Sequence, residues 1–415
     1  MLNIEKKTLQ SKLDIQGELS LFLKRRRIEL GLKLEDLSSG ICSTSYLSRI
    51  ENNLVDVDSS YYEALFEKMN IDYETLKESR RRNLYHEILN AYINNDISGI
   101  EEVINHAIIS KSYIDSEIDL YLLFYNILTK NYEEARKIVV KIENIKKNLH
   151  SYEILFYMFS FALYAHKTNQ NKKAYQQMLL LNEIVYEDIL LESCIYDLGI
   201  DVMEAVGMEL LSFNYYYNLE KVAGMPLFRE RLLLHKMKFM VKFSDIESEG
   251  ILKDALSITK NIDFSKEYNK ETYYYHLGLL YYKLGNFEEL AKILKDNLLS
   301  ARCACLLGTV CFNTQDKELS RSIGDIVNNY KFNKYETYFL DFCKFITLYL
   351  NDNSDYVLLN YLKNILFNKS NFYYDLIEEI KMKEYVPLLI ACGKYKEASR
   401  EFVKYLAKSK HKKLI

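Results

Sequence analysis

Turn-forming residues are scarce in this chain of 415 residues, which has two prolines, Pro226 and Pro387, and thirteen glycines. These are roughly 0.5% and 3% of the chain, against typical usage of about 5% and 7%. Because β-sandwiches and β-barrels need many tight turns, this scarcity argues against an all-β fold and against a Pro/Gly-rich disordered chain. Hydrophobic residues make up 49% and charged residues 27%, a balance typical of a folded protein. The composition therefore predicts an all-α protein.

Long apolar runs and an excess of one charge are also missing. The longest strongly apolar stretch is 154–165, whereas a membrane-spanning helix needs about twenty residues. The net charge is −3, so any contact with nucleic acid must be local. The N-terminal MLNIEKKTLQ lacks an apolar signal core, and seven cysteines, an odd number, do not suit a disulfide framework. A protein of the reducing cytoplasm without membrane contact is expected.

Motifs of catalysis and cofactor binding are absent from the sequence. It has no phosphate loop, no Rossmann glycine pattern and no nucleophile elbow. Residues 86–87 read His-Glu, as a zinc-peptidase motif begins, but Asn90 stands where the second histidine is needed. The cysteine spacing at 303, 305 and 311 fits no common zinc site, and the carboxylates are expected on solvated helix faces. No enzyme, no metal and no cofactor are therefore expected.

The segment 17–75 shows short helical patterns separated by turns. Gly31 is expected to end a first helix, because glycine adopts the positive φ of a helix C-terminus without penalty. After a break at Gly40, Ser43 is expected to cap a third helix, since its hydroxyl accepts from free amides of the first turn. This is the helix-turn-helix plan of four or five helices. The expected helices are 17–30, about 34–39, one that starts after Ser43, and about 59–70.

Three stretches of this segment resemble the phage-repressor class of helix-turn-helix: LKRRR at 23–27, Gly31-Leu32 with EDL at 35–37, and GICSTSYLSRIEN at 40–52. The Ile-Cys pair, followed by Ser-x-x-Ser-Arg-Ile-Glu spacing, is similar to the peptide-pheromone-responsive transcriptional regulators, the PlcR, NprR, Rgg and PrgX group. The resemblance implies a DNA-binding domain.

Roles on the third helix follow from this resemblance. Thr44, Ser45 and Tyr46 match the start of the recognition helix, where side chains reach base edges in the major groove. Ser48 and Arg49 match positions that contact phosphates, which set the register on DNA.

The first helix carries the positive charge of the domain. Arg27 and Glu51 match a structural ion pair between the first and third helices of the class. Lys24 and Arg25, with Arg26, form a positive patch, for which phosphate contact and a solvated helix face both remain open.

Two departures from the class weaken the expected contact with DNA. The class usually has a phosphate-contacting Gln at the start of its second helix, and Leu34 occupies that position here. Residues 1–79 hold 11 Lys/Arg against 14 Asp/Glu, a charge of −3, whereas duplex binders are typically basic. A homodimer that reads two half-sites would compensate through effective concentration.

Weak internal repeats follow in the rest of the chain. The clearest copy is 274–287, with Tyr-x-x-Leu-Gly-x-x-Tyr-x-x-x-Gly-x-Phe, and it resembles a tetratricopeptide repeat. Ala135, Ala174 and Ala398 occupy one motif position, where a small side chain lets two helices cross closely. Because each helix pair needs its neighbours to bury its apolar face, a right-handed superhelix with a concave inner surface is expected.

The sequence therefore predicts four parts. They are an N-terminal extension 1–16, a helix-turn-helix DNA-binding domain 17–75, a helical linker 76–84 that contains three arginines at 80–82, and a tetratricopeptide-like repeat domain 85–415 for peptide binding and dimerisation.

This two-part layout also fits the pheromone-responsive group, whose repeat domains bind a short linear signalling peptide after its import. The resemblance implies a homodimer with double-stranded DNA and such a peptide as partners. Asparagines would hold the peptide backbone, and aromatic rings would line its pockets. The alternative is that rings at this spacing pack the superhelix. The candidate peptide-binding residues are Asn126, Phe159, His166, Asn214, Asn218, Tyr275 and Tyr282.

The sequence thus predicts a cytoplasmic quorum-sensing transcriptional regulator switched by a peptide. Two alternatives stay open. The repeat domain would instead sequester a partner such as a response regulator, or the protein would be a phage regulator of lysis and lysogeny with the same layout.

Overall fold

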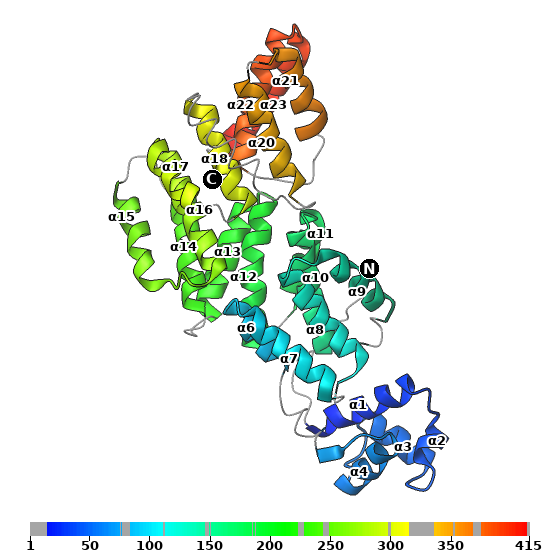
Figure 1. Ribbon diagram of the computed structural model, residues 1–415. Helices are drawn as coiled ribbons and strands as arrows, with labels where there is room; N and C mark the ends of the chain where they lie inside the picture. The colour runs from blue at the N-terminus through cyan, green and yellow to red at the C-terminus, as the bar shows by residue number, and fades with distance from the viewer. Residues whose placement is uncertain are drawn as a thin grey trace. The chain divides into compact units, whose positions relative to one another are not determined.

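The computed structural model places most of the chain in helices (Figure 1). Within the residues that it describes there is no strand, which confirms the predicted all-α class. The described residues are 15–74, 76, 84–110, 113–145, 149, 151–184, 186, 188–222, 228–243, 249–297, 300–314, 336–351, 353–367 and 375–412.

The helices in chain order are α1 Ile15–Glu29, α2 Leu34–Ser38, α3 Thr44–Glu51, α4 Ser59–Lys68, α6 Leu84–Ile93, α7 Ile97–Ser110, α8 Asp115–Leu128, α9 Tyr132–Ile145, α10 Ser151–Lys167, α11 Asn171–Asn182, α12 Ile189–Ala205, α13 Glu209–Val222, α14 Arg229–Phe243, α15 Glu249–Ile258, α16 Glu267–Lys283, α17 Phe287–Asp296, α18 Ala301–Thr314, α20 Thr337–Leu350, α21 Asp355–Tyr361, α22 Asp375–Ala391 and α23 Tyr395–Lys412. The turn η3 Thr259–Asn261 follows α15, and η4 Leu362–Leu366 extends α21.

The first four helices form a small domain around its own core. The helices expected near 17–30, 34–39, after Ser43 and 59–70 are confirmed as α1 to α4, with their ends within two residues. Leu23 of α1, Leu37 of α2, Ile50 of α3 and Phe66 of α4 are fully buried in one cluster. Gly31 adopts a φ of 68°, as expected for a residue that ends a helix. The predicted extension up to residue 14 and most of the predicted linker, including its arginines, lie outside the described residues.

A backbone signature marks the turns between paired helices. One residue in each turn adopts a positive φ of 55–74°: Asn95 before α7, Lys130 before α9, Asn169 before α11 and Gly207 before α13. These positions recur at intervals of roughly one tetratricopeptide-like unit, slightly longer than its about 34 residues. The interval supports the irregular repeats read from the sequence, and it shows asparagine and lysine in place of the scarce glycine.

Small residues allow the helices of a pair to approach. Ala135, Ala174 and Ala398, which were expected at close crossings, are all buried. Gly278 of α16 is equally tight, because a Cβ there would lie 3.0 Å from a methyl of Leu306 and 3.3 Å from one of Leu294. The small side chains thus set the distance between neighbouring helices.

The chain divides into two compact units. Unit 1 comprises Met1–Lys167 and Lys173–Gly199, and unit 2 comprises Thr168–Lys172 and Ile200–Ile415. Unit 1 therefore joins the helix-turn-helix segment and the first helix pairs in one compact body, so this division falls inside the predicted repeat region.

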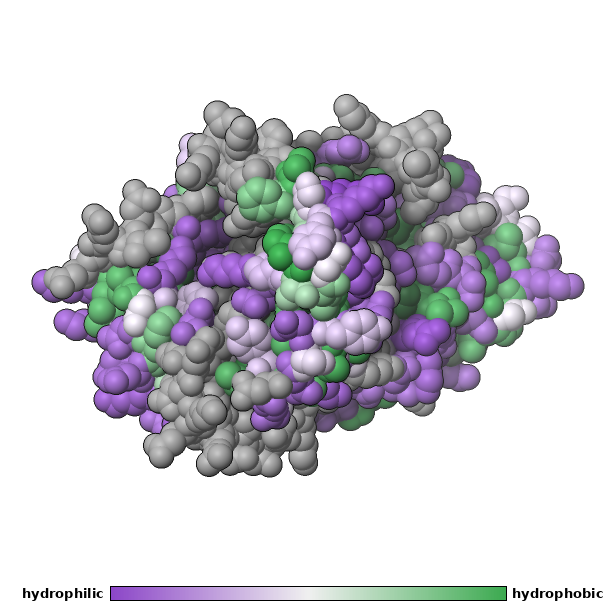
Figure 2. Space-filling model, turned by 90° about the horizontal axis from the view of Figure 1, so that it is seen from above, coloured by the Kyte–Doolittle hydropathy of each residue, from purple (hydrophilic) through white to green (hydrophobic). Residues whose placement is uncertain are grey.

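Apolar side chains on the surface are interspersed with hydrophilic ones on the face drawn in Figure 2. On α13, for example, Leu210, Phe213 and Tyr217 are exposed beside the half-buried Asn218. Among the helices described, none combines the length and the apolar composition that a bilayer span requires.

Candidate functional site

The start and the buried face of helix α3 follow from its own sequence. The hydroxyl of Ser43 accepts a hydrogen bond of 3.1 Å from the backbone N–H of Tyr46, which caps the start of α3. Leu47 and Ile50, one turn apart, are fully buried in the domain core. The opposite face of α3 is therefore left to solvent or a ligand.

That opposite face carries the predicted DNA contacts. Ser45 and Arg49 are exposed, and Thr44 and Ser48 are half-buried. Hydroxyl groups near the helix start and a guanidinium one turn later suit base edges and phosphates respectively.

Two predicted contact positions have packing roles. The ring of Tyr46 lies edge-on to that of Tyr61, with centroids 5.3 Å apart, and Tyr46 also packs against the domain core. Leu34, at the position where the class carries Gln, packs against the same core.

The Arg27–Glu51 pair lies between α1 and α3 as an almost dry bidentate ion pair. Arg27 Nε and Nη2 donate to the two carboxylate oxygens of Glu51 at 2.6 and 2.8 Å, and Arg27 Nη1 donates to the Leu32 carbonyl. The hydrogen bonds that Arg27 donates to Glu51 raise the pKa of Arg27 despite its burial. At the C-terminus of α3, Lys24 Nζ donates to Asn52 Oδ1 at 2.8 Å. The side chains of Arg27 and Lys24 thus connect α1 to Glu51, the last residue of α3, and to its C-cap residue Asn52.

Arg25 does not face solvent, as its place in the predicted positive patch would imply. Its Nη1 and Nη2 donate to Glu153 Oε1 and Oε2 of α10, both at 2.7 Å, and the side chains are 12% and 4% exposed. Burial opposes the charge of Arg25, but the hydrogen bonds and attraction of Glu153 outweigh it and raise its pKa. The neighbouring Arg26 pairs instead with Glu29 in its own helix, at 3.0 Å.

Histidine 86, considered above for a zinc motif, takes part in a structural hydrogen-bond network of unit 1. Its Nε2 lies 2.6 Å from Asp188 Oδ2, which also accepts from the Tyr152 hydroxyl at 2.6 Å. Asp188 Oδ1 accepts from the backbone N–H of Leu190 at 2.9 Å and so caps α12. Burial would raise the pKa of Asp188, but the hydrogen bonds from His86 and Tyr152 lower it.

The predicted peptide-binding residues of unit 1 are mostly engaged in packing. Phe159 is fully buried, with its ring 5.8 Å from that of Phe124 and 6.1 Å from that of Tyr92. His166 is buried, while Asn126 is half-buried and donates to the Leu122 carbonyl at 2.7 Å. Phe159 thus packs the interior, which is the alternative left open for rings at this spacing.

The predicted peptide-binding residues of unit 2 are more accessible. Asn214 is exposed and Asn218 half-buried, both on α13. Tyr282 of α16 is half-buried, and its hydroxyl accepts from Asn313 Nδ2 at 3.1 Å. Tyr275 is buried, with its ring 5.1 Å from the ring of His276. The structure thus leaves Asn214, Asn218 and Tyr282 of this group at least partly open to a ligand.

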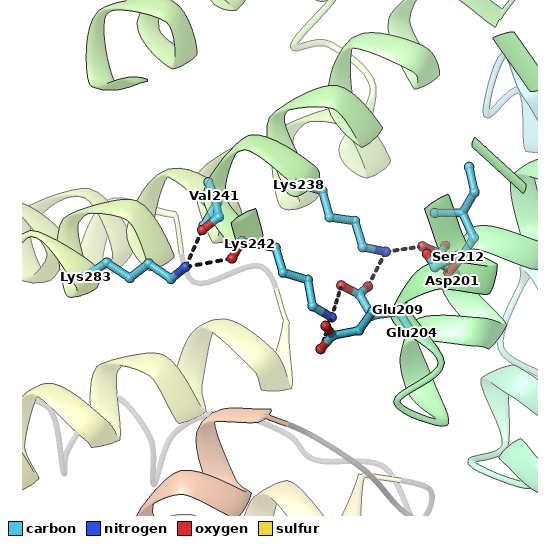
Figure 3. A network of polar contacts seen from close by, with 9 residues as sticks. Asp201, Glu204, Glu209, Ser212, Lys238, Val241, Lys242 and Lys283 are labelled. Carbon is cyan, nitrogen blue, oxygen red and sulfur yellow. Dashed lines mark hydrogen bonds and ion pairs between the residues drawn. The ribbon is translucent and has the colours of Figure 1, made fainter. Parts of the chain in front are cut away.

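A buried charge network in unit 2 was missed by the sequence analysis (Figure 3). Lys238 of α14 donates to Asp201 of α12 at 2.8 Å and pairs with Glu204 of the same helix. Lys242, one turn further along α14, lies 3.7 Å from Glu204 and 3.3 Å from Glu209. These three carboxylates pair with lysines of a neighbouring helix while their side chains stay 27–31% exposed, so they are partly open to solvent.

The electrostatics of this network extend to the next helix pair. Burial would raise the pKa of Glu204, but attraction to Lys238 and Lys242 outweighs it and lowers that pKa. Burial and the nearby charge of Lys238 lower the pKa of His276 in α16 to about 4. The ring Nδ1 of His276 donates to the Thr272 carbonyl at 2.7 Å, since a carbonyl can only accept. The network therefore links α12, α14 and α16 through charge pairs and a neutral histidine.

A spacing signal for this network is present in the sequence. Arg231, His235, Lys238 and Lys242 recur at steps of four, three and four residues, which places them on one face of α14. Arg231, His235 and Lys238 are all buried, and the guanidinium of Arg231 lies 4.9 Å from the ring centre of Tyr268. Because three residues of this basic stripe are buried, the stripe predicts carboxylate partners on neighbouring helices.

Cysteine and metal chemistry have little support among the described side chains. Cys305 and Cys343 are buried with their sulfurs 4.0 Å apart, and burial raises the pKa of Cys305. Where side chains are described, no three His, Cys, Asp or Glu residues gather as metal ligands. The side chain of Cys311 lies outside the described ones.

Comparisons with known proteins place the fold. No protein-family model and no curated protein sequence matches the chain. The apo form of the quorum sensor NprR from B. thuringiensis is similar with a TM-score of 0.53 and 15% identity, over 83% of this chain and 99% of that one. The Streptococcus dysgalactiae SHP pheromone receptor Rgg2 reaches a TM-score of 0.31 at 13% identity, over 61% and 98% of the two chains. NprR belongs to the group that the sequence resembles, and this chain shares its all-helical fold.

Proposed function

We propose that this protein is a cytoplasmic transcriptional regulator that binds operator DNA through α3 and is switched by a short imported signalling peptide. The observation that carries the proposal is the order of its parts. A Ser43-capped helix with an open polar face is followed by repeated helix pairs, in a chain with the fold of a quorum sensor. The two regulators with similar structures support this general kind of function.

The proposed contacts with DNA lie on the open face of α3. Thr44 and Ser45 read base edges, and Ser48, Arg49 and Lys24 hold phosphates. Tyr46 can offer DNA no more than one edge of its ring, because the ring packs against that of Tyr61. Since one domain offers few cations, we propose that a homodimer binds two half-sites.

The proposed peptide site uses the accessible amides of the repeats. In unit 2, Asn214, Asn218 and the hydroxyl of Tyr282 are the proposed contacts to an extended peptide backbone, and Asn126 is the candidate in unit 1. His166 and Tyr275 are buried, so no direct contact with the peptide is proposed for them. The peptide switches the protein to the extent that it binds one arrangement of the helices better than another.

The test is a genome-wide pull-down of bound DNA at physiological salt, with wild type and a Thr44→Ala/Ser45→Ala/Arg49→Ala variant. Arg136→Ala, which removes an exposed arginine from α9, is the matched control. The proposal expects a few discrete sites with two-fold symmetry, lost in the triple variant and kept in the control. Sites that persist in the triple variant would move the reading surface away from α3.

A second candidate function is favoured by the scarcity of free cations on the domain. Leu34 packs against the core where the class has a phosphate-contacting Gln, and Arg25 of the predicted positive patch is paired with Glu153. In this case the repeats sequester a protein partner such as a response regulator. Absence of enriched DNA, with and without culture supernatant as a peptide source, would favour this function, and so would co-purification of one stoichiometric protein. A phage lysis–lysogeny regulator of the same layout would instead bind DNA beside phage genes.

A further inference from the structure

Helix α1 carries two arginine–glutamate pairs that reach in different directions. Arg27 donates two hydrogen bonds to Glu51 of α3, and Arg25 donates two to Glu153 of α10, all of 2.6–2.8 Å. Because successive residues of an α-helix are turned by about 100°, side chains two residues apart lie on nearly opposite sides. The helix therefore holds the recognition helix on one side and a repeat helix on the other.

The setting of Arg25 is that of a packed interface. Its side chain is 12% exposed and that of Glu153 is 4% exposed. The second carboxylate that attracts Arg25 is Glu117, buried on α8. The half-buried Tyr85 has its ring within 5.0 Å, centre to centre, of the rings of Tyr121 and of the α10 residue Phe156. A bidentate, desolvated pair of this kind fixes the orientation of two helices as well as their distance.

We infer that Arg25 is a positioning residue rather than a phosphate contact: the Arg25–Glu153 pair is the joint that fixes α1, and with it α3, on α10. The inference rests on the proposed function for its meaning in DNA binding. A movement of α10 or α8 passes through Arg25 to α1 and through Arg27 to the recognition helix. Any ligand that shifts α8 or α10 would thereby change the presentation of α3.

Arg26, next to Arg25 on the same helix, is the more exposed arginine for comparison. Arg26 pairs with Glu29 of its own helix, and the two side chains are 24% and 27% exposed. Removing Arg26 therefore removes the same charge, one residue away, without touching α10. Arg26→Gln is the matched control for Arg25→Gln.

The first experiment measures hydrogen–deuterium exchange of the full chain without DNA. Arg25→Gln and Glu153→Gln are each expected to speed amide exchange in α1 and α10 about tenfold or more, because either change leaves a buried charge unpaired. Arg26→Gln is expected to leave both helices as in wild type. The reversed pair Arg25→Glu/Glu153→Arg is expected to restore protection at least in part, which mere misfolding would not do. Unchanged exchange in both single variants would overturn the joint.

The second experiment separates the joint from a phosphate contact. The affinity for a short non-specific DNA duplex is measured at several salt concentrations for wild type, Arg25→Gln and Arg49→Gln. Each lost phosphate contact lowers the slope of log K against log salt by about 0.9. Arg49→Gln is expected to show this loss and Arg25→Gln to keep the wild-type slope, whereas a loss of about 0.9 in Arg25→Gln would overturn the inference. If wild type binds no DNA, the proposed function fails, and the exchange experiment still decides whether the joint exists.

Discussion

Several pairs of neighbouring helices in this protein are joined by an ion pair in which at least one charged side chain is buried. Glu51, Glu153 and Lys238 are all buried, and each meets a partner of opposite charge on a neighbouring helix. An ion pair that is buried contributes modestly as a pair, but loss of one partner is costly because the other charge stays in a poor solvent. Substitutions at these residues are therefore expected to act far more strongly than at exposed pairs.

Glu51→Gln tests this expectation at the ion pair between α1 and α3. The amide keeps the shape of the side chain but leaves Arg27 without its carboxylate, so the free energy of opening α3 should fall by about 3 kcal/mol. Native-state hydrogen exchange of α3 measures that free energy. Glu29→Gln, which breaks an exposed pair of α1, should change the stability by no more than about 0.5 kcal/mol. Equal effects of the two substitutions would contradict the structural role of Glu51.

His276 predicts how the stability of unit 2 depends on pH. Its pKa is about 4 in the fold, because burial and Lys238 disfavour the charged ring, against about 6.5 in an unfolded chain. Between these values the unfolded state binds more protons, so stability is full above pH 6.5 and falls as the pH drops towards 4. The fall from this residue should be about 3 kcal/mol in total.

The measurement compares wild type with His276→Gln by urea denaturation at several pH values between 7 and 4. Glutamine retains a donor for the Thr272 carbonyl but has no titratable ring. The advantage of wild type over the variant should shrink steadily through this interval. A difference that is constant with pH would show that His276 does not titrate between the folded and unfolded states.

At the scale of elements, the turn of each helix pair requires a left-handed residue that this glycine-poor chain supplies in several ways. Gly207 and Gly285 accept a positive φ without cost, and Asn95 and Asn169 tolerate it. Lys130, with a φ of 62°, has a Cβ that clashes in this conformation. The α8–α9 turn is therefore the strained member of the series.

Lys130→Gly should stabilise unit 1 by about 1 kcal/mol, since it removes the strain of the left-handed conformation. The same substitution at Lys137, in the exposed middle of α9, should destabilise by about 1 kcal/mol, because glycine is a poor helix former. The opposite signs of the two changes in thermal or denaturant unfolding are the test. A loss of stability at both sites would show that the Lys130 side chain makes a compensating contact.

At the scale of the whole molecule, the charge of residues 1–79 limits how one domain can bind DNA. With 11 Lys/Arg against 14 Asp/Glu, counterion release by a single domain is small. If the protein acts as the proposed operator-binding regulator, specific binding depends on two such segments held in one homodimer. The separation of the half-sites would then report how the repeats position these segments.

Fluorescence anisotropy with a full operator and with an isolated half-site measures this dependence. The full site should bind about 10²–10⁴-fold more tightly, through the effective concentration of the second domain. Its salt slope should be about twice that of the half-site, because twice as many phosphates are neutralised. Equal affinities for the two duplexes would show that one domain acts alone.

Local chemistry in the sequence was enough to predict the fold class and the four short helices of the N-terminal segment. Ser43 caps α3 and Gly31 ends α1 because these preferences depend on a few neighbouring residues only. The alternation of buried Leu47 and Ile50 with exposed Ser45 and Arg49 follows in the same way from the helical period.

Only the tertiary structure decided which charges lie inside. Arg25 and Arg26 are adjacent and chemically identical, yet one is buried against a carboxylate 128 residues away and the other pairs within its own helix. Phe159, expected at a peptide surface, is a core ring for the same reason. A helical period tells which side chains share a face, but the neighbour that covers that face is set by long-range packing of helices remote in the chain.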